Sequence, residues 1–203
     1  MSNKNDYIDR RIVKSKKAMK DAILSLMKEK DFNEISITDI VRFADLNRGT
    51  FYKHYQYKED LFNEIIDEVL TSLVDSYREP YKGIQLLEVN KLTTSAVKVF
   101  DHVQQYSNFY SLIVQPNVLT GFQQKFCTVL KDLTLNDLND SLPNPKVNRE
   151  LHASYQAYAI LGLIIEWING GFIYSSTYMA EQLLEILKHS IASSVVKTNF
   201  ETN

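Results

Sequence analysis

The stretch ISITDIVRFADLNRGTFYKHYQYKEDLF, residues 35–62, contains two short helical patterns separated by turn-forming residues. In the first pattern, Ser36 and Asp39 have capping-box spacing, in which a hydroxyl and a carboxylate satisfy the loose amides of a first turn. Four apolar residues then recur at i, i+3, i+4 and i+7, the spacing of one buried helical face: Ile37, Ile40, Val41 and Ala44. We therefore expect a short helix over residues 36–44.

The turn DLN, residues 45–47, leads into a second short helix expected over 48–55. Asp45 tolerates the left-handed backbone conformation better than most residues, and Asn47 is a good N-cap for the helix that follows. Within that helix, Phe51 and Tyr55 are four residues apart and share an inward face. The opposite, solvent-facing side then carries Arg48, Gly49, Tyr52 and Lys53.

Gly49 lies inside this second helix, where glycine costs roughly 1 kcal/mol relative to alanine. On an exposed face, a missing side chain lets another molecule approach the backbone closely. We therefore expect something outside the protein to come close to the backbone at residue 49.

Two short helices joined by a three-residue turn form a helix-turn-helix, whose second helix fits the DNA major groove. The Arg48 guanidinium can make a bidentate contact with a guanine edge or a phosphate, and the hydroxyls of Thr50 and Tyr52 are long enough to reach DNA. Three further residues sit where phosphates would lie: Lys53, His54 and Lys58. The free amides that begin the next helix, near residues 57–60, add an anion site.

The same stretch resembles the DNA-binding domain of the TetR family of bacterial transcriptional repressors. The match consists of T-x-I-V-x-x-A, R-G-T-F-Y-x-H-Y and K-E-x-L-F at matching spacings, over roughly the first quarter of the chain. The resemblance implies DNA-facing positions for Thr38, Gly49, Thr50, Tyr52, His54 and Lys58. Asp45 and Asn47 depart from the family's usual glycine and serine, and an acid near DNA would weaken binding or alter specificity.

The charge distribution favours an anionic partner for the N-terminal part of the chain. The net charge of the 203 residues is −2, but residues 1–60 hold 13 Lys/Arg against 10 Asp/Glu, whereas the remainder holds 10 against 15. Six cations, with no acid among them, crowd the first half of a helix expected over 10–30: Arg10, Arg11, Lys14, Lys16, Lys17 and Lys20.

The rest of the chain reads as helical, without an alternating strand pattern. After a helix that ends near Pro80, we expect helices near 86–106, 109–115, 119–138, 147–169 and 177–197, with a polar loop at 139–145. The expected fold is all-α with about nine helices. A three-helix helix-turn-helix domain, residues 1–56, precedes a larger helical ligand-binding and dimerisation domain, residues 57–203.

The last two long helices suit pairing into a homodimer, which would read two half-sites about 34–36 Å apart on a DNA operator. One carries the small residues Ala153, Ala157 and Gly162, and the other an apolar stripe of Met179, Leu183, Ile186, Leu187 and Ile191. Two such helices from each chain would make a four-helix bundle. The alternative is that they only fill the core of one chain. Glu166 interrupts an apolar run, and we expect it at the dimer rim rather than in a ligand pocket.

The middle helices are rich in aromatic residues, which suits a pocket for a hydrophobic small-molecule effector. The candidate ligand-binding residues are Phe100, Tyr106, Tyr110, Phe126, Tyr155 and Tyr158. An aromatic stripe at helical spacing equally suits a packed core. If a ligand binds there, it would act by favouring a conformation with wrongly spaced recognition helices.

Other classes of function lack a signature in the sequence. There is no glycine-rich phosphate loop, metal motif or nucleophile signature, so we expect no enzyme, no cofactor and no metal site. The single Cys127 and the absence of a signal-peptide pattern favour the cytoplasm. The longest apolar run, residues 157–172, is short for a bilayer span, so no membrane partner is expected. A coactivator that has given up DNA for a protein partner remains an alternative, which Asp45 and the acidic total would fit.

Overall fold

The computed structural model describes residues 4–82, 93–114, 116–137 and 146–188, and every regular element within them is helical. Nine α-helices are described: α1 (Lys4–Leu26), α2 (Ile37–Phe43), α3 (Arg48–Tyr52), α4 (Lys58–Arg78), α5 (Val99–Gln105), α6 (Ser107–Ile113), α7 (Pro116–Asn136), α8 (Arg149–Asn169) and α9 (Ser176–Lys188). Short 3-10 turns are η1 (Phe32–Glu34), η2 (Glu79–Tyr81) and η4 (Thr94–Ala96). The all-α class is confirmed.

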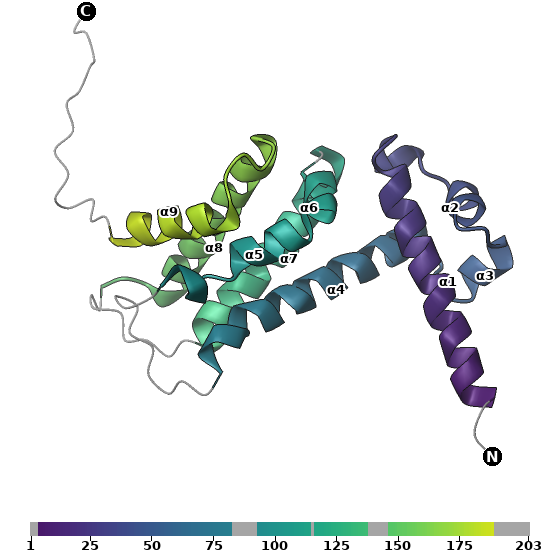
Figure 1. The fold of residues 1–203 in the computed structure, drawn as a ribbon, viewed down its shortest axis with the longest axis horizontal. Coiled ribbons are helices and arrows are strands. Elements are labelled where there is room, and N and C mark those ends of the chain that lie inside the picture. Colours follow the sequence, from purple (N-terminus) through teal and green to yellow (C-terminus); the bar gives the residue numbers. More distant parts are fainter. Residues whose placement is uncertain (1–3, 83–92, 115, 138–145, 189–203) are drawn as a thin grey trace, which may run out of the picture.

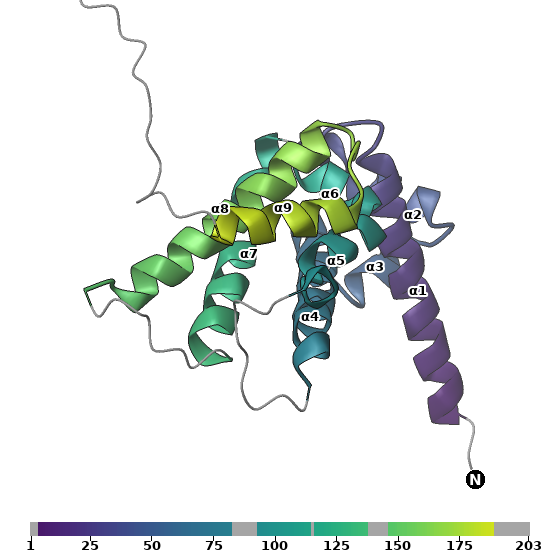
Figure 2. The same ribbon diagram turned by 60° about the vertical axis from the view of Figure 1, so that its left-hand side comes forward.

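The helices form two groups joined by α4. Helices α1, α2 and α3 gather at one end of the molecule, which we call the head, and α5 to α9 gather at the other, which we call the body (Figure 1). Helix α4 runs from the head along the body, packing against α1 at one end and against α5 and α7 further along. In the turned view α9 lies over α5, which it contacts (Figure 2). The division at residues 56 and 57 stays a prediction.

Helix α4 supplies an apolar face to both groups because its apolar residues recur at helical spacing. Leu61, Ile65, Val69 and Leu73 are all buried, as predicted from that spacing. Burying one such side chain contributes on the order of 1.5–3 kcal/mol. One core cluster runs through the head and the body, so α4 is packed along its whole length.

Some predicted boundaries differ from the structure, chiefly after α4. The single helix expected over 86–106 is instead η4 followed by α5, and α6 begins directly after Tyr106, whose backbone leaves the helical region at φ −101° and ψ 25°. The expected start at 86, the loop at 139–145, Ile191 and the expected end at 197 lie outside the described residues. The end predicted for the helix near 147–169 is confirmed, since α8 ends at Asn169 and Gly171, two residues later, adopts φ 71°.

None of the described helices is both long enough and apolar enough to cross a bilayer. Within the same parts of the chain, no group of three or more His, Cys, Asp or Glu side chains is arranged to hold a metal ion.

Candidate nucleic-acid interface

Helix α2 begins with the capping box predicted from the sequence. The Ser36 hydroxyl accepts a hydrogen bond from the Asp39 amide at 3.1 Å, and the Asp39 carboxylate accepts one from the Ser36 amide at 3.0 Å. Two cations also hold this carboxylate: Lys30 donates to it at 2.9 Å and Arg42 at 3.0 Å. The Lys30 hydrogen bond is the largest cause that holds the pKa of Asp39 well below its usual range. The start of α2 is therefore fixed by both charge and hydrogen bonds.

The turn between α2 and α3 has the geometry expected of its residues. Asp45 adopts φ 53°, so the left-handed conformation predicted for this position is confirmed. Asn47 is the N-cap of α3, since its Oδ1 accepts from the Thr50 amide at 2.8 Å. The Thr50 hydroxyl also donates to that oxygen, at 3.1 Å.

Helix α3 is shorter than predicted but buries the predicted residues. It ends at Tyr52 rather than near residue 55, and two turn residues follow. Phe51 is fully buried and Tyr55 is 5% exposed, with ring centroids 5.6 Å apart. These two rings fix α3 in the head, so the opposite side of α3 must face outward.

The outward side of the helix-turn-helix carries most of the predicted DNA-contacting residues. Thr38, Arg48, Gly49, Tyr52 and Lys53 are exposed, and Thr50 and His54 are half-buried. Arg48 and Tyr52 are already paired, because a guanidinium nitrogen of Arg48 donates to the Tyr52 hydroxyl at 3.1 Å and the guanidinium lies 5.8 Å from the ring centroid. This surface offers several N–H and O–H donors on α3 and the residues around it.

Gly49 is exposed to solvent, but the Asn47 side chain lies close to the place where a side chain at residue 49 would begin. A Cβ atom built at this position would lie 3.2 Å from Oδ1 of Asn47, which is tighter than an ordinary contact. The N-cap of α3 therefore contributes a reason for glycine that the sequence did not reveal. An approach from outside the protein at this position stays a prediction.

His54 is less available as a cation than its position in the motif indicated. Burial is the main cause that lowers the pKa of its imidazole below the ordinary value, and the nearby charge of Lys16 acts in the same direction. The ring is therefore more neutral near pH 7 than a solvent-exposed histidine, and its part in binding would be that of a neutral N–H donor.

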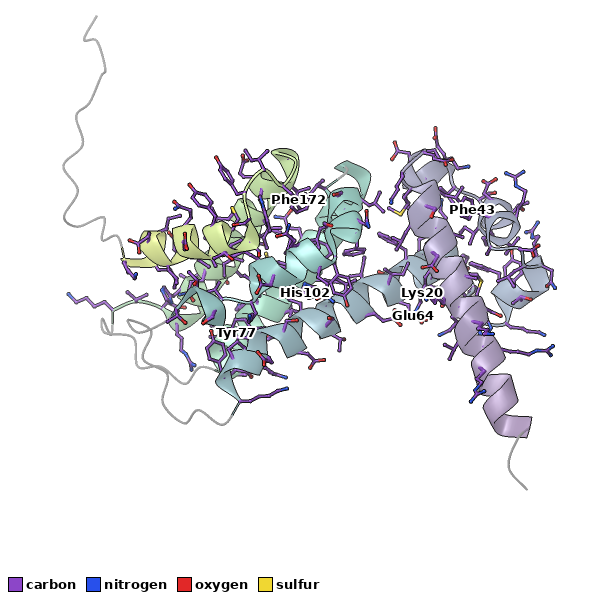
Figure 3. The ribbon with its side chains drawn as sticks, in the orientation of Figure 1. Lys20, Phe43, Glu64, Tyr77, His102 and Phe172 are labelled. Atoms are coloured by element: carbon purple, nitrogen blue, oxygen red, sulfur yellow. The ribbon has the colours of Figure 1, made fainter. Side chains whose placement is uncertain are left out.

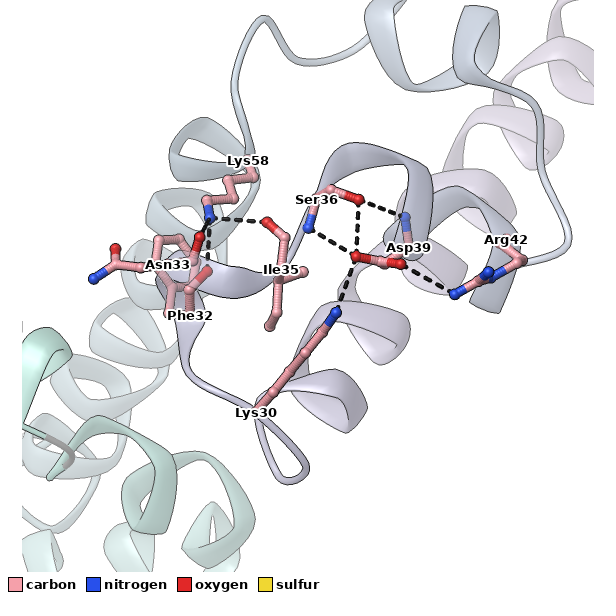
Figure 4. A network of polar contacts seen from close by, with 8 residues as sticks. All are labelled: Lys30, Phe32, Asn33, Ile35, Ser36, Asp39, Arg42 and Lys58. Carbon is pink, nitrogen blue, oxygen red and sulfur yellow. Dashed lines mark hydrogen bonds and ion pairs between the residues drawn. The ribbon is translucent and has the colours of Figure 1, made fainter.

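Lys58 differs most from its expected position on the DNA-facing surface. Its ammonium donates to the backbone carbonyls of Phe32, Asn33 and Ile35, at 2.6, 3.1 and 2.8 Å (Figure 4). Three contacts with the protein's own backbone occupy the three N–H groups that a phosphate would need. The structure thus gives Lys58 partners that sequence reasoning missed.

Two of the six cations of α1 face α4 rather than solvent. Lys20 donates to Glu64 at 2.7 Å, and both residues are labelled in Figure 3. Lys20 also donates to Glu68 at 2.6 Å, and Lys16 donates to Glu64 at 2.8 Å. Partial burial alone would raise the pKa of Glu64, but the two lysine hydrogen bonds outweigh it and lower that pKa to about 2. Lys16 and Lys20 therefore join α1 to α4, and Arg10, Lys14 and Lys17 remain on the exposed face.

The six aromatic residues predicted to line one ligand pocket are divided between the core and the surface. Phe100, Tyr110 and Phe126 are fully buried in the core, where Phe100 packs edge-on against Trp167. Tyr155 and Tyr158 are 68% and 52% exposed on α8. Their part in a ligand pocket stays a prediction, since both side chains lie at the surface of the single chain. Tyr106 lines a surface groove of about 470 Å³ between α1, α4 and α6.

His102, beside these core aromatics, is buried and makes the fold sensitive to acid. Its Nδ1 lies 3.2 Å from the Tyr110 hydroxyl, and burial lowers its pKa to about 4. The unfolded chain binds a proton near pH 6.5 and the fold only near pH 4, so stability falls as pH drops between these values. We expect His102 to account for about 2 kcal/mol of lost unfolding free energy between pH 7.5 and 5.

Urea unfolding of the wild type and of His102→Gln at both pH values measures this contribution. The variant should lose much less stability on acidification than the wild type does. His152→Gln is the matched control, since His152 is only half-buried on α8, and it should keep the wild-type pH dependence. Equal pH dependence in all three proteins would rule out His102 as the acid-sensitive group.

Comparison with known proteins places this geometry in a family. A sequence profile described as bacterial regulatory proteins of the tetR family matches residues 21–65, which include α2, the turn and α3. A second profile, described as a transcriptional regulator C-terminal region, matches residues 90–189. The chain belongs to the TetR family. The family resemblance of the helix-turn-helix is therefore confirmed.

Individual relatives are distant. An uncharacterized HTH-type transcriptional regulator of Bacillus subtilis, YxbF, is 21% identical over 170 residues, covering 83% of this chain and 43% of its own length. The dhaKLM operon transcriptional activator DhaS of Lactococcus lactis is 26% identical over 126 residues, covering 59% of this chain and 63% of its own. The chain thus spans less than two thirds of either relative.

A solved structure gives the same fold. NalD, the secondary repressor of the MexAB-OprM multidrug efflux pump in Pseudomonas aeruginosa, superposes with a TM-score of 0.64 at 23% identity. The alignment covers 87% of this chain and 96% of NalD. At this identity, the likeness shows that the two proteins share a TetR-like fold.

Proposed function

We propose that this protein is a dimeric, cytoplasmic DNA-binding regulator, a repressor that a small-molecule ligand releases from a palindromic operator. The outward side of α3 carries the proposal, since Arg48, Tyr52 and Lys53 are exposed on a short helix whose other side is anchored by buried Phe51. An exposed helix of this kind fits the major groove, and Thr38 on α2 would meet the flanking backbone. The proposed DNA contacts are Thr38, Arg48, Gly49, Thr50, Tyr52, Lys53 and His54.

Exposed apolar side chains on α8 support the proposed dimer. Leu151, Tyr155 and Tyr158 are 71%, 68% and 52% exposed, and they recur at spacings of four and three along the helix. An exposed apolar stripe of this size is typical of a protein–protein contact. Ile186 and Leu187 add exposed apolar surface on α9, at 53% and 51%. A second copy would cover both helices.

Gly162 and Glu166 continue the same α8 stripe, at spacings of four residues, and both are exposed. A Cβ built at Gly162 would meet nothing within 4 Å, so no contact inside the chain requires glycine there. A partner helix that approaches α8 closely would require glycine at this position. The other small residues predicted to face the partner, Ala153 and Ala157, are instead buried within the chain on the face toward α7. Glu166, at the end of the stripe, suits the rim of the proposed dimer.

Tyr158→Glu is expected to convert the protein to a monomer, because two copies would place carboxylates in the apolar contact. Sedimentation velocity would show the change in mass at concentrations where the wild type is dimeric. The fold should be retained, since Tyr158 is half exposed. Thr71→Glu adds the same charge at an exposed position of α4 and should leave the dimer intact. A Tyr158→Glu protein that remains dimeric would place the interface elsewhere.

The proposed ligand would act on the body and so change the distance between the two heads of the dimer. Helix α4 packs against both groups of helices, which makes it the connection through which a change in the body reaches α2 and α3. A ligand that prefers the conformation with wrongly spaced heads would draw the protein off DNA.

A gel shift with the DNA that flanks the protein's own gene, over a series of salt concentrations, tests the proposal. Binding should weaken steeply as salt rises, because Lys and Arg contacts release counterions from the phosphates. Absence of salt-dependent binding would instead favour the coactivator alternative, in which a protein partner replaces DNA.

A further inference from the structure

The start of α4 and the connection before α2 are joined through one side chain. Lys58, the first residue of α4, places its ammonium among three backbone carbonyls of the segment that contains η1 (Figure 4). The ammonium also lies 4.7 Å from the centroid of the Phe32 ring. We call this arrangement, Lys58 with the carbonyls of Phe32, Asn33 and Ile35, the Lys58 clamp.

A lysine at the first position of a helix is unfavourable by itself, because the helix dipole is positive at that end. The three carbonyl oxygens supply the compensating negative charge. The contacts with Phe32 and Ile35 are half-buried, and a half-buried carbonyl left without a hydrogen bond costs roughly 1–3 kcal/mol. The Phe32 carbonyl would keep only the bond that it accepts from the Ile35 amide at 3.2 Å. Moving the ammonium onto a phosphate would break all three contacts at once.

The clamped segment determines where the helix-turn-helix begins. Ile35 is buried and is followed directly by Ser36, whose capping box starts α2. On the other side, the Phe32 ring packs on Phe62 of α4 at 5.1 Å, and Phe62 lies 6.5 Å from Phe109 of α6. The clamp therefore lies between the start of α2 and the contact of α4 with the body.

We propose that Lys58 is a positioning residue: it holds the segment before α2 on the start of α4 and thereby sets the angle at which the head presents α3. It supports operator binding through this geometry and makes no phosphate contact. The inference rests on the proposed function, because its effect is measured on DNA binding.

The test compares Lys58→Met, which keeps the aliphatic stem and removes the ammonium, with Lys53→Met at the exposed end of α3. For Lys53→Met, the slope of log K against log salt should decrease by roughly 1.8 for the two copies in a dimer, without a change in melting temperature. For Lys58→Met, affinity should fall at least about tenfold while the salt slope stays at the wild-type value. Hydrogen exchange in residues 31–36 should also become faster in Lys58→Met only.

Lys58→Arg separates charge from geometry, because a planar guanidinium keeps the charge but cannot match three carbonyls gathered around one nitrogen. The clamp predicts that this variant also binds DNA more weakly than the wild type. A reduced salt slope in Lys58→Met, together with wild-type affinity in Lys58→Arg, would overturn the inference in favour of a phosphate contact. Faster exchange with unchanged DNA affinity would also overturn it, by showing a purely local role. A wild type that binds no duplex would instead refute the proposed function.

Discussion

Replacing Arg48 with alanine is expected to weaken operator binding by at least about 30-fold without unfolding the protein. Each arginine contact with a base edge or phosphate is worth about 1–3 kcal/mol, and a dimer has two copies, so the loss is at least about 2 kcal/mol. The exposed guanidinium is already held by the Tyr52 hydroxyl and ring, so little ordering is needed on binding. Fluorescence anisotropy with a labelled operator duplex measures the affinity.

Alanine variants at Tyr52 and Lys82 serve as comparisons for Arg48→Ala. Tyr52→Ala should also weaken binding, because it removes a proposed DNA contact and the support of Arg48. Lys82→Ala removes one positive charge beyond the far end of α4 and should bind as the wild type does. Unchanged melting curves confirm that the variants fold. Equal affinity of Arg48→Ala and the wild type would place the DNA contact away from α3.

Phe51→Ala is expected to destabilise the head by about 3–5 kcal/mol, the usual cost of deleting a fully buried phenylalanine. Phe51 is 0% exposed and contacts the rings of Tyr52 and Tyr55. A loss of this size is a large part of the stability of a typical domain, so the variant should also lose DNA binding. Urea unfolding followed by circular dichroism measures the change.

Phe43→Ala is the matched control, since it makes the same substitution on α2 of the same head. Phe43 is 55% exposed at the surface of the head (Figure 3), and the expected loss is within about 0.5 kcal/mol. Similar losses for Phe43→Ala and Phe51→Ala would mean that the face of α3 assigned to the core is wrong.

The helix-turn-helix was predictable because local interactions determine it. Ser36, Asp39, Asp45 and Asn47 act within three residues of their own positions, and the structure has their capping and turn geometry as predicted. The buried face of α3 likewise follows from the spacing of Phe51 and Tyr55. Such features depend on sequence spacing alone.

Contacts between distant segments were not predictable in the same way. Lys58 reaches carbonyls more than 20 residues earlier in the chain, and Lys16 and Lys20 meet acids 44 or more residues later. No local pattern distinguishes these lysines from exposed ones. The one signal available for Lys58 was its unfavourable position at the positive end of α4.

The direction in which the aromatic residues of α8 face was not predictable from the sequence either. Tyr155 and Tyr158 share helical spacing with core residues, so composition alone could not separate an inward stripe from an outward one. The direction follows from the packing of α8 on α7, which requires the fold to be known. Once that packing is in place, the exposed stripe supports the proposed contact with a partner copy.

Selection of bound sequences from a random pool of duplexes tests the central claim, that two copies present their α3 helices to DNA, most directly. We predict enrichment of an inverted repeat whose half-site centres lie one helical turn apart, about 10–10.5 base pairs, or a multiple of it. The Arg48→Ala protein, selected in parallel, should fail to enrich that repeat. A wild-type pool without any enriched repeat, or the same repeat recovered by Arg48→Ala, would contradict the account.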